Sequence, residues 1–428
     1  MDGDSPVTGA LHLLVYGELD SGVSALLRVG QFRKPLAALG VEVRGWSSFA
    51  DDVLSGGSAA GANSAVRAGE RAGTDALREI GMTAIAWADV ILFRRFNSTH
   101  YVCTECEDDF PGPDGHRRHL ADSGHYSLPI DPLIRPIVGL LATHPSMLGG
   151  RAIVYETDDD PLAYPDWTGL GPTARRERDL IEKLLGMADL VITTTPVLAG
   201  RLAGVAGAPV RVIRNALEPS WYTDAKPDCP GDAPGEPRVV YHGVPVRLRD
   251  YEVARPAVDA VASEIPGLRR VWLGAANEPR VAAALDEVRP WVDGGREFAA
   301  ALVAARPDIG LAPLLDERFN RAKSELHWLE YSLAGAATIA SGFAGGGPYD
   351  VVRDGVDGLV AHSPAEWAGH LRSLAASPDL RLEVAARARE RVLADYTVDA
   401  RAPEWADAYR WAAEHPGVAR ERTAAVAR

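Results

Sequence analysis

Residues 308–360 read DIGLAPLLDERFNRAKSELHWLEYSLAGAATIASGFAGGGPYDVVRDGVDGLV, and this stretch decides the fold. It begins with a short apolar run, Ile309 to Leu314, and continues through a polar turn into a helical pattern over Lys323 to Leu333. A second apolar run, Ala337 to Ser341, precedes a glycine-rich loop over Gly342 to Gly347. The order strand, helix, strand predicts one layer of a parallel α/β sheet.

Three polar residues of this stretch lie where a ligand is expected. In an open parallel sheet, ligands bind beyond the carboxyl ends of the strands, where helix N-termini offer backbone N–H groups to phosphate. Lys323 and Ser324 lie where such a helix can begin, and Glu330 follows about two helical turns later. The spacing indicates a site with a phosphate at one end and a ribose hydroxyl pair at the other.

These residues resemble the donor-binding core of retaining glycosyltransferases with the GT-B fold, the glycosyltransferase group 1 or family 4-like proteins. The matching pieces are the strand DIGLAPL, the run Asn320-x-x-Lys323-Ser324, Glu330, the glycine turn before Pro348-Tyr349, and DGVDGLV from Asp354. The resemblance implies that Glu330 binds the donor ribose. It also implies that the diphosphate and the sugar are faced by Lys323, Ser324 and the backbone of the glycine loop, Gly345 and Gly346 included.

The turn YHGVPVRLRD, residues 241–250, follows the first predicted strand of the second half. The resemblance implies that Gly243 lets the diphosphate approach the backbone. It further implies that Arg247 or Arg249 compensates the charge that leaves with the nucleotide. The alternative is a surface loop with one ion pair to Asp250.

The first half of the chain offers two further candidates. The loop Gly17 to Gly22 lets a backbone approach a ligand, and the resemblance makes Gly22 a contact to the donor, with Arg28 supplying charge for the diphosphate. The acidic turn YETDDD, residues 155–160, follows a predicted strand. Similar turns in the resembled enzymes point to Asp158 as a catalytic residue that contacts the acceptor or the sugar. The alternative is a helix N-cap with solvated charge.

Strand and helix patterns alternate in both halves of the chain, which predicts two Rossmann-like domains. The proline-rich segment PDCPGDAPGEP, residues 227–237, interrupts the alternation and marks a linker. With the resemblance, this predicts an α/β protein of the GT-B type, whose domains face each other across a cleft. The expected parts are an acceptor-side domain at 1–225, the linker at 226–237, a nucleotide-sugar-binding domain at 238–377, and C-terminal helices at 378–428 that pack back toward the first domain.

A pattern inside the first domain is unusual for this architecture. It reads Tyr101-x-Cys103-x2-Cys106-x3-Phe110-x8-His119-x5-His125, the spacing of a two-Cys, two-His zinc finger. The positions that read bases in such fingers are Gly112, Gly115 and Arg118, so base readout is not expected. We expect a structural zinc in an insertion over 100–127. The insertion would hold a loop or dock a macromolecular acceptor, which is a protein, a glycan or a nucleic acid.

Composition narrows the function classes. Of the 428 residues, 46% are hydrophobic and 24% are charged, as in a globular protein long enough for two domains. The formal net charge of −14 disfavours broad affinity for nucleic acid or anionic lipid. The sequence has no apolar run of transmembrane length and no signal-peptide pattern, so the expected location is cytoplasmic.

The leading interpretation is a glycosyltransferase that moves a sugar from a UDP- or GDP-linked donor to an acceptor hydroxyl, with retention of configuration. No catalytic divalent cation is expected, because side chains and helix dipoles can meet the charge of the diphosphate. Three alternatives stay open: a transferase acting on a modified nucleic-acid base, a nucleotide-sugar epimerase, and a catalytically silent zinc-finger adaptor. The adaptor is suggested by Ala322, since many relatives carry a second glutamate eight positions before the residue equivalent to Glu330.

Overall fold

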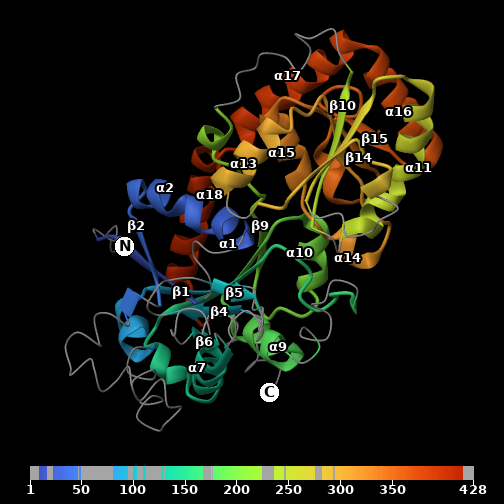
Figure 1. The fold of residues 1–428 in the computed structure, drawn as a ribbon. Coiled ribbons are helices and arrows are strands. Elements are labelled where there is room, and N and C mark those ends of the chain that lie inside the picture. Colours follow the sequence, from blue (N-terminus) through green and yellow to red (C-terminus); the bar gives the residue numbers. More distant parts are fainter. Residues whose placement is uncertain are drawn as a thin grey trace. The chain divides into compact units, whose positions relative to one another are not determined.

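The computed structural model divides into two compact units, each assembled from separate stretches of the chain (Figure 1). The first unit contains residues 1–21, 32–213 and 402–428, and the second contains residues 22–31 and 214–401. The structure describes residues 9–16, 23–46, 48–49, 81–94, 100–103, 109–111, 127–129, 131–166, 175, 177–223, 236–244, 247–274, 282–292 and 295–417.

The first unit contains a six-stranded parallel sheet with helices. The strand order is β2-β1-β3-β7-β8-β9, with β1 at Leu11–Tyr16, β2 at Val41–Gly45, β3 at Val90–Arg94, β7 at Ala152–Thr157, β8 at Leu190–Thr193 and β9 at Val210–Val212. Strands β3 and β7 are buried along their whole length, as expected of parallel strands covered on both faces. The helices include α2 (Arg33–Ala38), α7 (Asp131–Thr143), α9 (Arg178–Met187) and α10 (Pro196–Leu202), with a short 3-10 turn at Pro145–Leu148. A 3-10 turn at Gly30–Phe32 lies at the boundary between the two units.

A small antiparallel sheet spans the predicted zinc-binding insertion, 100–127, and ends at Pro129, just beyond it. Its strands are β4 (His100–Cys103), β5 (Asp109–Pro111) and β6 (Ser127–Pro129), in the order β5-β4-β6. Among the four predicted zinc ligands, the backbone of Cys103 is described, at the end of β4. The other three, Cys106, His119 and His125, lie outside the described residues. The zinc site therefore stays a prediction.

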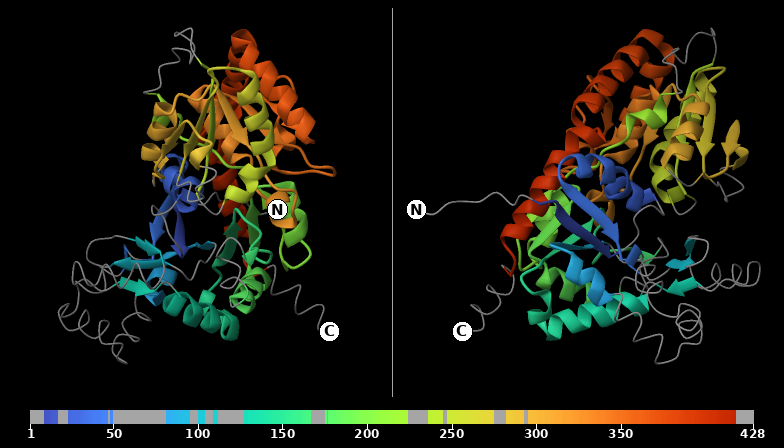
Figure 2. Two further views of the ribbon diagram at one scale, coloured as in Figure 1. Left: turned by 45° about the vertical axis from the view of Figure 1, so that its right-hand side comes forward. Right: turned by 90° about the vertical axis from the view of Figure 1, so that its left-hand side faces the viewer.

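The second unit contains a second six-stranded parallel sheet (Figures 1 and 2). Its order is β12-β11-β10-β13-β14-β15, with β10 at Arg238–His242, β11 at Arg269–Leu273, β12 at Glu287–Arg289, β13 at Ile309–Ala312, β14 at Ala337–Ser341 and β15 at Leu359–Ala361. Its helices are α1 (Val23–Arg28), α11 (Leu248–Glu264), α13 (Gly295–Ala304), α14 (Arg318–Arg321), α15 (Leu326–Ala334), α16 (Pro364–Ala376) and α17 (Pro378–Asp395), with 3-10 turns at Pro219–Tyr222 and Pro348–Val351. No helix in the described ranges is both long and apolar enough to cross a membrane.

Alternation along β10 sends its side chains to opposite faces of this sheet. Val239 and Tyr241 pack with α11 and α16 in one core cluster. Val240 belongs to the other cluster, with residues of α13, α15 and α17. Because side chains alternate along a strand, His242 lies on the same face as Val240, toward α13 and α15. Its ring centroid lies 5.1 Å from that of Phe298 in α13.

The unit boundaries differ from the predicted domain boundaries. The second unit begins at Arg214, well before the predicted linker at 226–237, of which only residues 236–237 are described. The backbone of Leu217 bonds to Tyr396 and Val398, which ties this segment to the second unit. Helix α17 also belongs there, although it was expected to pack back on the first domain. The last helix, α18 (Val398–Glu414), passes into the first unit at Ala402, where Trp405 contacts Phe32.

Candidate functional site

Tyr331 ties α15 to β10 in the second unit. Its hydroxyl donates to the carbonyl oxygen of Val240 at 2.9 Å and accepts from the backbone N–H of His242 at 3.1 Å. A Cβ on Gly310, in β13, would come within 2.3 Å of the Tyr331 ring, so the contact requires glycine there. The preceding residue of the helix, Glu330, is thereby held against His242.

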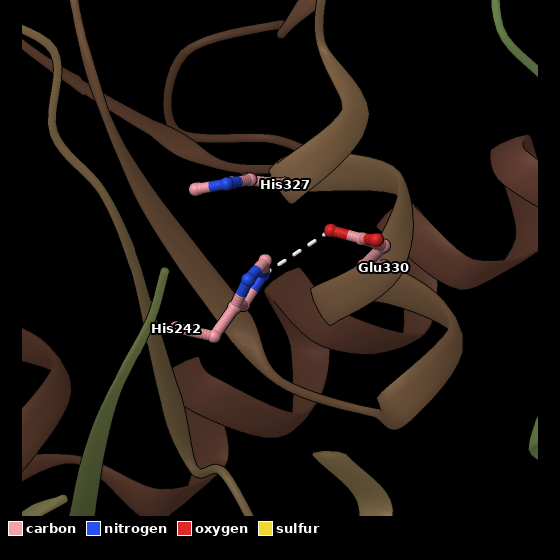
Figure 3. Close-up of side chains that lie close together, drawn as sticks. All are labelled: His242, His327 and Glu330. Atoms are coloured by element: carbon pink, nitrogen blue, oxygen red, sulfur yellow. Dashed lines mark ion pairs between the residues drawn. The ribbon is translucent and has the colours of Figure 1, made fainter. Parts of the chain in front are cut away.

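Two histidines and a glutamate converge at this point (Figure 3). His242 ends β10, while His327 and Glu330 lie three positions apart on α15, a spacing that places them on one helix face. His242 Nε2 is 3.2 Å from Glu330 Oε2, and both side chains are almost fully buried. The rings of His242 and His327 have centroids 4.1 Å apart. One ligand atom from each residue lies within 4.8 Å of the other two. We call these three residues the His–His–Glu cluster.

The cluster contains polar atoms that are buried without hydrogen bonds to the described part of the chain. They are His242 Nε2, His327 Nδ1 and Glu330 Oε2. The contact between His242 and Glu330 is an ion-pair distance without the geometry of a hydrogen bond. Because buried polar groups normally have a partner, these atoms make the cluster a candidate site for a ligand.

His327 is surrounded by groups that disfavour its protonation. Burial lowers the pKa of its imidazole well below the usual range, and His242, Arg247 and Lys323 lower that pKa further. His327 is therefore neutral at physiological pH. Arg247 and Lys323, both predicted to face the diphosphate, thus lie within electrostatic reach of the cluster that contains Glu330.

Arg247 is held by a buried polar network at the start of α11. Its Nη1 lies 3.2 Å from Asp250 Oδ2 and 3.4 Å from Asn320 Oδ1. Asp250 is buried, and its Oδ1 accepts from Asn320 Nδ2 at 2.7 Å and from the Leu315 backbone N–H at 2.9 Å. The ion pair between Arg247 and Asp250, which the surface-loop alternative predicted, is present. The Asp250 carboxylate, however, is buried in a network that joins α11 to the segment after β13.

Ser324 is oriented by a chain of two hydrogen bonds. Asn215 Oδ1 accepts from Arg28 Nη1 at 3.2 Å, and Asn215 Nδ2 donates to Ser324 Oγ at 2.7 Å. A guanidinium carries only donors, so Asn215 must turn its oxygen toward Arg28 and its NH₂ toward Ser324. Ser324 Oγ accepts from Asn215, and its own proton has no acceptor among the described residues, so it can be donated to a ligand. Arg28 itself is 1% exposed, and its contribution of charge to the diphosphate stays a prediction.

The glycine loop after β14 has a backbone that favours glycine at two predicted positions. Gly345 and Gly346 have φ angles of 82° and 108°, in the left-handed region. Arg321 Nη1 donates to the carbonyl oxygen of Ala344 at 2.7 Å, and its guanidinium also pairs with Asp316. The loop is therefore anchored to the segment after β13 by a side chain from α14.

Gly243 lies in a tightly packed turn after β10. A Cβ there would come within 3.0 Å of the Tyr241 hydroxyl and 3.3 Å of Arg247 Cβ. The carbonyl oxygen of Gly243 accepts from Trp272 Nε1 at 3.0 Å. A side chain on Gly274 would overlap that oxygen at 2.0 Å. Packing is therefore enough to disfavour a side chain at position 243. The predicted approach of a diphosphate would be a second reason for glycine there.

The remaining candidates of the second unit have different surroundings. Arg249 is exposed on the first turn of α11. Lys323 Nζ lies 4.7 Å from the ring centroid of Phe319. Ala322, at the position where many relatives carry a second glutamate, is fully buried. Gly22 lies outside the described residues.

Asp158 belongs to the first unit and follows β7. It is partly buried, and its carbonyl oxygen accepts from Thr194 Oγ1 at 3.4 Å. The next two aspartates are buried: Asp160 pairs with Arg201 at 3.2 Å, and Asp159 accepts from the Tyr164 hydroxyl at 3.3 Å. These two carboxylates are therefore built into the fold and are not the solvated charge of the alternative interpretation.

Sequence reasoning did not identify His327, Asn215 or Asp250 as part of the site. The interval His327-x-x-Glu330 was a usable signal, because residues three apart share a helix face. His242 was noted in the turn after the first strand of the second half, but nothing in its local sequence connects it with Glu330.

Part of the chain matches a known family. Residues 249–407, less than half of the chain, match the model described as glycosyl transferase-like. Most of that range belongs to the second unit and includes His327 and Glu330. No curated protein matches the sequence.

Solved structures resemble nearly the whole chain. A sucrose-phosphate synthase from Thermosynechococcus elongatus is 17% identical, with a TM-score of 0.55, over 94% of this chain and 98% of that one. HepE of Anabaena, solved with UDP and glucose, is 14% identical, with a TM-score of 0.54, over 93% and 98% of the two chains. A glycosyltransferase from Rickettsia africae is 12% identical, with a TM-score of 0.51, over 95% and 99%. The likeness concerns the fold, and it confirms the predicted GT-B architecture.

Proposed function

We propose that this protein is a glycosyltransferase that moves a sugar from a nucleotide-diphosphate donor to an acceptor hydroxyl, with retention of configuration. The observation that carries the proposal is the gathering of Glu330, Arg247, Lys323 and the glycine loop at the carboxyl ends of β10, β13 and β14 in the second unit. Ligands of open parallel sheets bind at such ends. The family match over residues 249–407 supports the same activity.

Each of these residues has a role in holding the donor. The Glu330 carboxylate accepts hydrogen bonds from the two ribose hydroxyls. Arg247 and Lys323 carry the positive charge that stabilises the departing diphosphate, and Asp250 and Asn320 keep Arg247 in position. No protein nucleophile and no catalytic divalent ion enter the proposed reaction.

Ser324 and the glycine loop complete the proposed diphosphate site. Because Asn215 donates to Ser324 Oγ, the serine proton is available to a phosphate oxygen. Gly345 and Gly346 let the backbone approach the ligand without a side chain in between. Arg249, exposed near the start of α11, is a second cation for the diphosphate, and Gly22 and Gly243 are backbone contacts. Asp158, in the first unit, is proposed to contact the acceptor or the transferred sugar.

The test is calorimetric titration of the purified chain with UDP, GDP and their common sugar conjugates. UDP-linked donors come first, because HepE was solved with UDP and with UDP-glucose. We expect one nucleotide to bind with a stoichiometry of one and to raise the melting temperature by mass action. Binding followed by nucleotide release only when an acceptor is present supports the transferase. Conversion of the donor without acceptor would indicate an epimerase, and the absence of binding to every nucleotide would favour the adaptor.

The zinc prediction belongs to this proposal as a structural element. Cys103, Cys106, His119 and His125 would hold one Zn²⁺ in the insertion, where their spacing suits a tetrahedral ion. We expect the purified chain to contain about one tightly bound zinc per molecule, and Cys103→Ser to remove it. Metal content is measured by inductively coupled plasma mass spectrometry, with the exposed His144→Gln as the matched control. Unchanged zinc in Cys103→Ser would contradict the assignment.

A further inference from the structure

The His–His–Glu cluster has features that ribose binding by Glu330 alone does not explain. Two imidazoles face one carboxylate, and each of the three side chains has an atom buried without a hydrogen bond to the described residues. Leaving such atoms unpaired costs free energy, so the arrangement calls for a ligand that contacts all three. A ribose diol satisfies the carboxylate and leaves at least one ring nitrogen without a partner.

A single metal ion fits the geometry of the three atoms. Zinc binds imidazole nitrogen and carboxylate oxygen at about 2.0–2.2 Å in a tetrahedron, which puts neighbouring ligand atoms about 3.4 Å apart. His242 Nε2 and Glu330 Oε2 already lie 3.2 Å apart, and no pair of ligand atoms exceeds 4.8 Å. Two imidazoles and one carboxylate form a donor set that suits divalent transition metals and leaves a fourth position open.

We propose that His242, His327 and Glu330 form a binding site for a divalent transition-metal ion of the zinc class. We further propose that this ion excludes the donor, a part that rests on the proposed function, because metal and ribose need the same Glu330 carboxylate. The ion has no role in sugar transfer. It holds the enzyme in a form that does not bind donor.

The surroundings predict an exchangeable ion. Arg247 and Lys323 act electrostatically on His327, and these positive charges weaken the binding of a cation. We therefore expect metal to be lost on dialysis against a chelator and regained on titration, in contrast to the structural zinc of the insertion.

The test uses Co²⁺, which reports on its ligands through its absorption spectrum. The full chain carrying Cys103→Ser and Cys106→Ser, which lacks the thiolates of the predicted zinc finger, is titrated with Co²⁺. We expect one ion per chain, with visible d–d bands and no thiolate charge-transfer band. His327→Gln should weaken this binding at least tenfold, whereas His144→Gln, at an exposed position of the first unit, should not change it. No bound Co²⁺, or equal binding by the His327→Gln variant, overturns the site.

The same titration can be made in the wild-type cysteine background if the double cysteine variant does not fold. In that background, the intensity of the thiolate charge-transfer band measures Co²⁺ bound in the insertion. The total stoichiometry measures the ion in the insertion plus the ion in the His–His–Glu cluster. His327→Gln should lower the total from two to one without changing the thiolate band. A total that stays at two, or a thiolate band that falls with this variant, overturns the assignment.

Competition with the donor is measured separately. UDP is titrated calorimetrically at several free Co²⁺ concentrations held by a metal buffer, since the diphosphate itself binds the ion. We expect the apparent Kd of UDP to rise linearly with the free Co²⁺ concentration, and to rise at least tenfold less steeply in His327→Gln. Equal UDP affinity at all Co²⁺ concentrations overturns the exclusion. If UDP fails to bind with or without metal, the proposed function fails, while the metal site is still decided by the Co²⁺ stoichiometry.

Discussion

Buried charged side chains at the strand ends of the two sheets are arranged in different ways. In the first unit, Arg94 ends β3, and its Nε donates to Glu156 Oε2, on β7, at 2.9 Å, with both side chains almost fully buried. In the second unit, His242 and Glu330 are equally buried at 3.2 Å but without hydrogen-bond geometry. A buried charge is tolerated when it is paired and is costly when its partner is removed, whereas buried atoms without hydrogen bonds point to a ligand.

The largest effect is expected from breaking the pair in the first unit. Glu156→Ala should lower the free energy of unfolding by about 3–5 kcal/mol, because the buried guanidinium of Arg94 then loses the carboxylate that lies 2.9 Å from its Nε. UDP affinity, carried by the second unit, should stay unchanged at temperatures where the variant is folded. Urea denaturation and calorimetry measure the two quantities. A loss of UDP affinity in the folded variant would contradict the assignment of this pair to stability alone.

Glu330→Ala tests the buried His242–Glu330 contact of the second unit. Hydrogen bonds to a charged group contribute about 1.5–3 kcal/mol each, so losing the contacts to the ribose diol should weaken UDP binding roughly 100-fold. Stability should change little, because the carboxylate removed has a buried oxygen without a hydrogen bond to the described residues. The exposed Glu390→Ala is the matched control and should bind UDP like the wild type. Wild-type UDP affinity in Glu330→Ala would remove the ribose assignment.

Gly310→Ala tests whether packing positions the site. The added Cβ would meet the Tyr331 ring at 2.3 Å, and overpacking of this kind costs about 1–3 kcal/mol of stability. Because Tyr331 joins α15 to β10, the shift should also weaken UDP binding several-fold. Gly369→Ala, at a helix position with open space around a Cβ, is the control. Unchanged stability and affinity in Gly310→Ala would contradict the role given to the Tyr331 contact.

Asn215→Asp should have the smallest effect on stability and the most specific effect on UDP binding. An aspartate can still accept from Arg28, but it cannot donate to Ser324, so the serine proton turns toward the aspartate and away from the ligand. We expect UDP affinity to fall about tenfold, as in Ser324→Ala, with the melting temperature unchanged or higher. The double variant should be no worse than either single one. Additive losses in the double variant would show that Asn215 and Ser324 act separately.

Local sequence was sufficient for the parts of the site that lie close together in the chain. The stretch 308–360 predicted a strand, a helix and a second strand, and the structure has β13, α15 and β14 there. Glu330 was singled out from its position on that helix. The motif around Asp354 also has a local cause, since Asp354 Oδ1 accepts from the Val360 N–H and Asp357 accepts from the Arg353 N–H.

Contacts between segments that are distant in the sequence could not be predicted from local sequence patterns. Residues 22–31 belong to the second unit, and Arg28 is committed to Asn215, although both were expected in the first domain. Helix α17 belongs to the second unit because it packs on α15 and β14. Periodicity shows that a helix has an apolar face, but it does not show which sheet covers that face.

The sequence by itself therefore determined the α/β class, the two parallel sheets and the choice of Glu330, because strand alternation and helix spacing are properties of neighbouring residues. Only the tertiary structure brought His242 to His327 and Glu330, through a tyrosine hydroxyl that bonds to β10 and a glycine in β13 that makes room for the ring. Long-range packing decides which polar atoms are buried and which of them lack partners, and that is the information from which a ligand site is inferred.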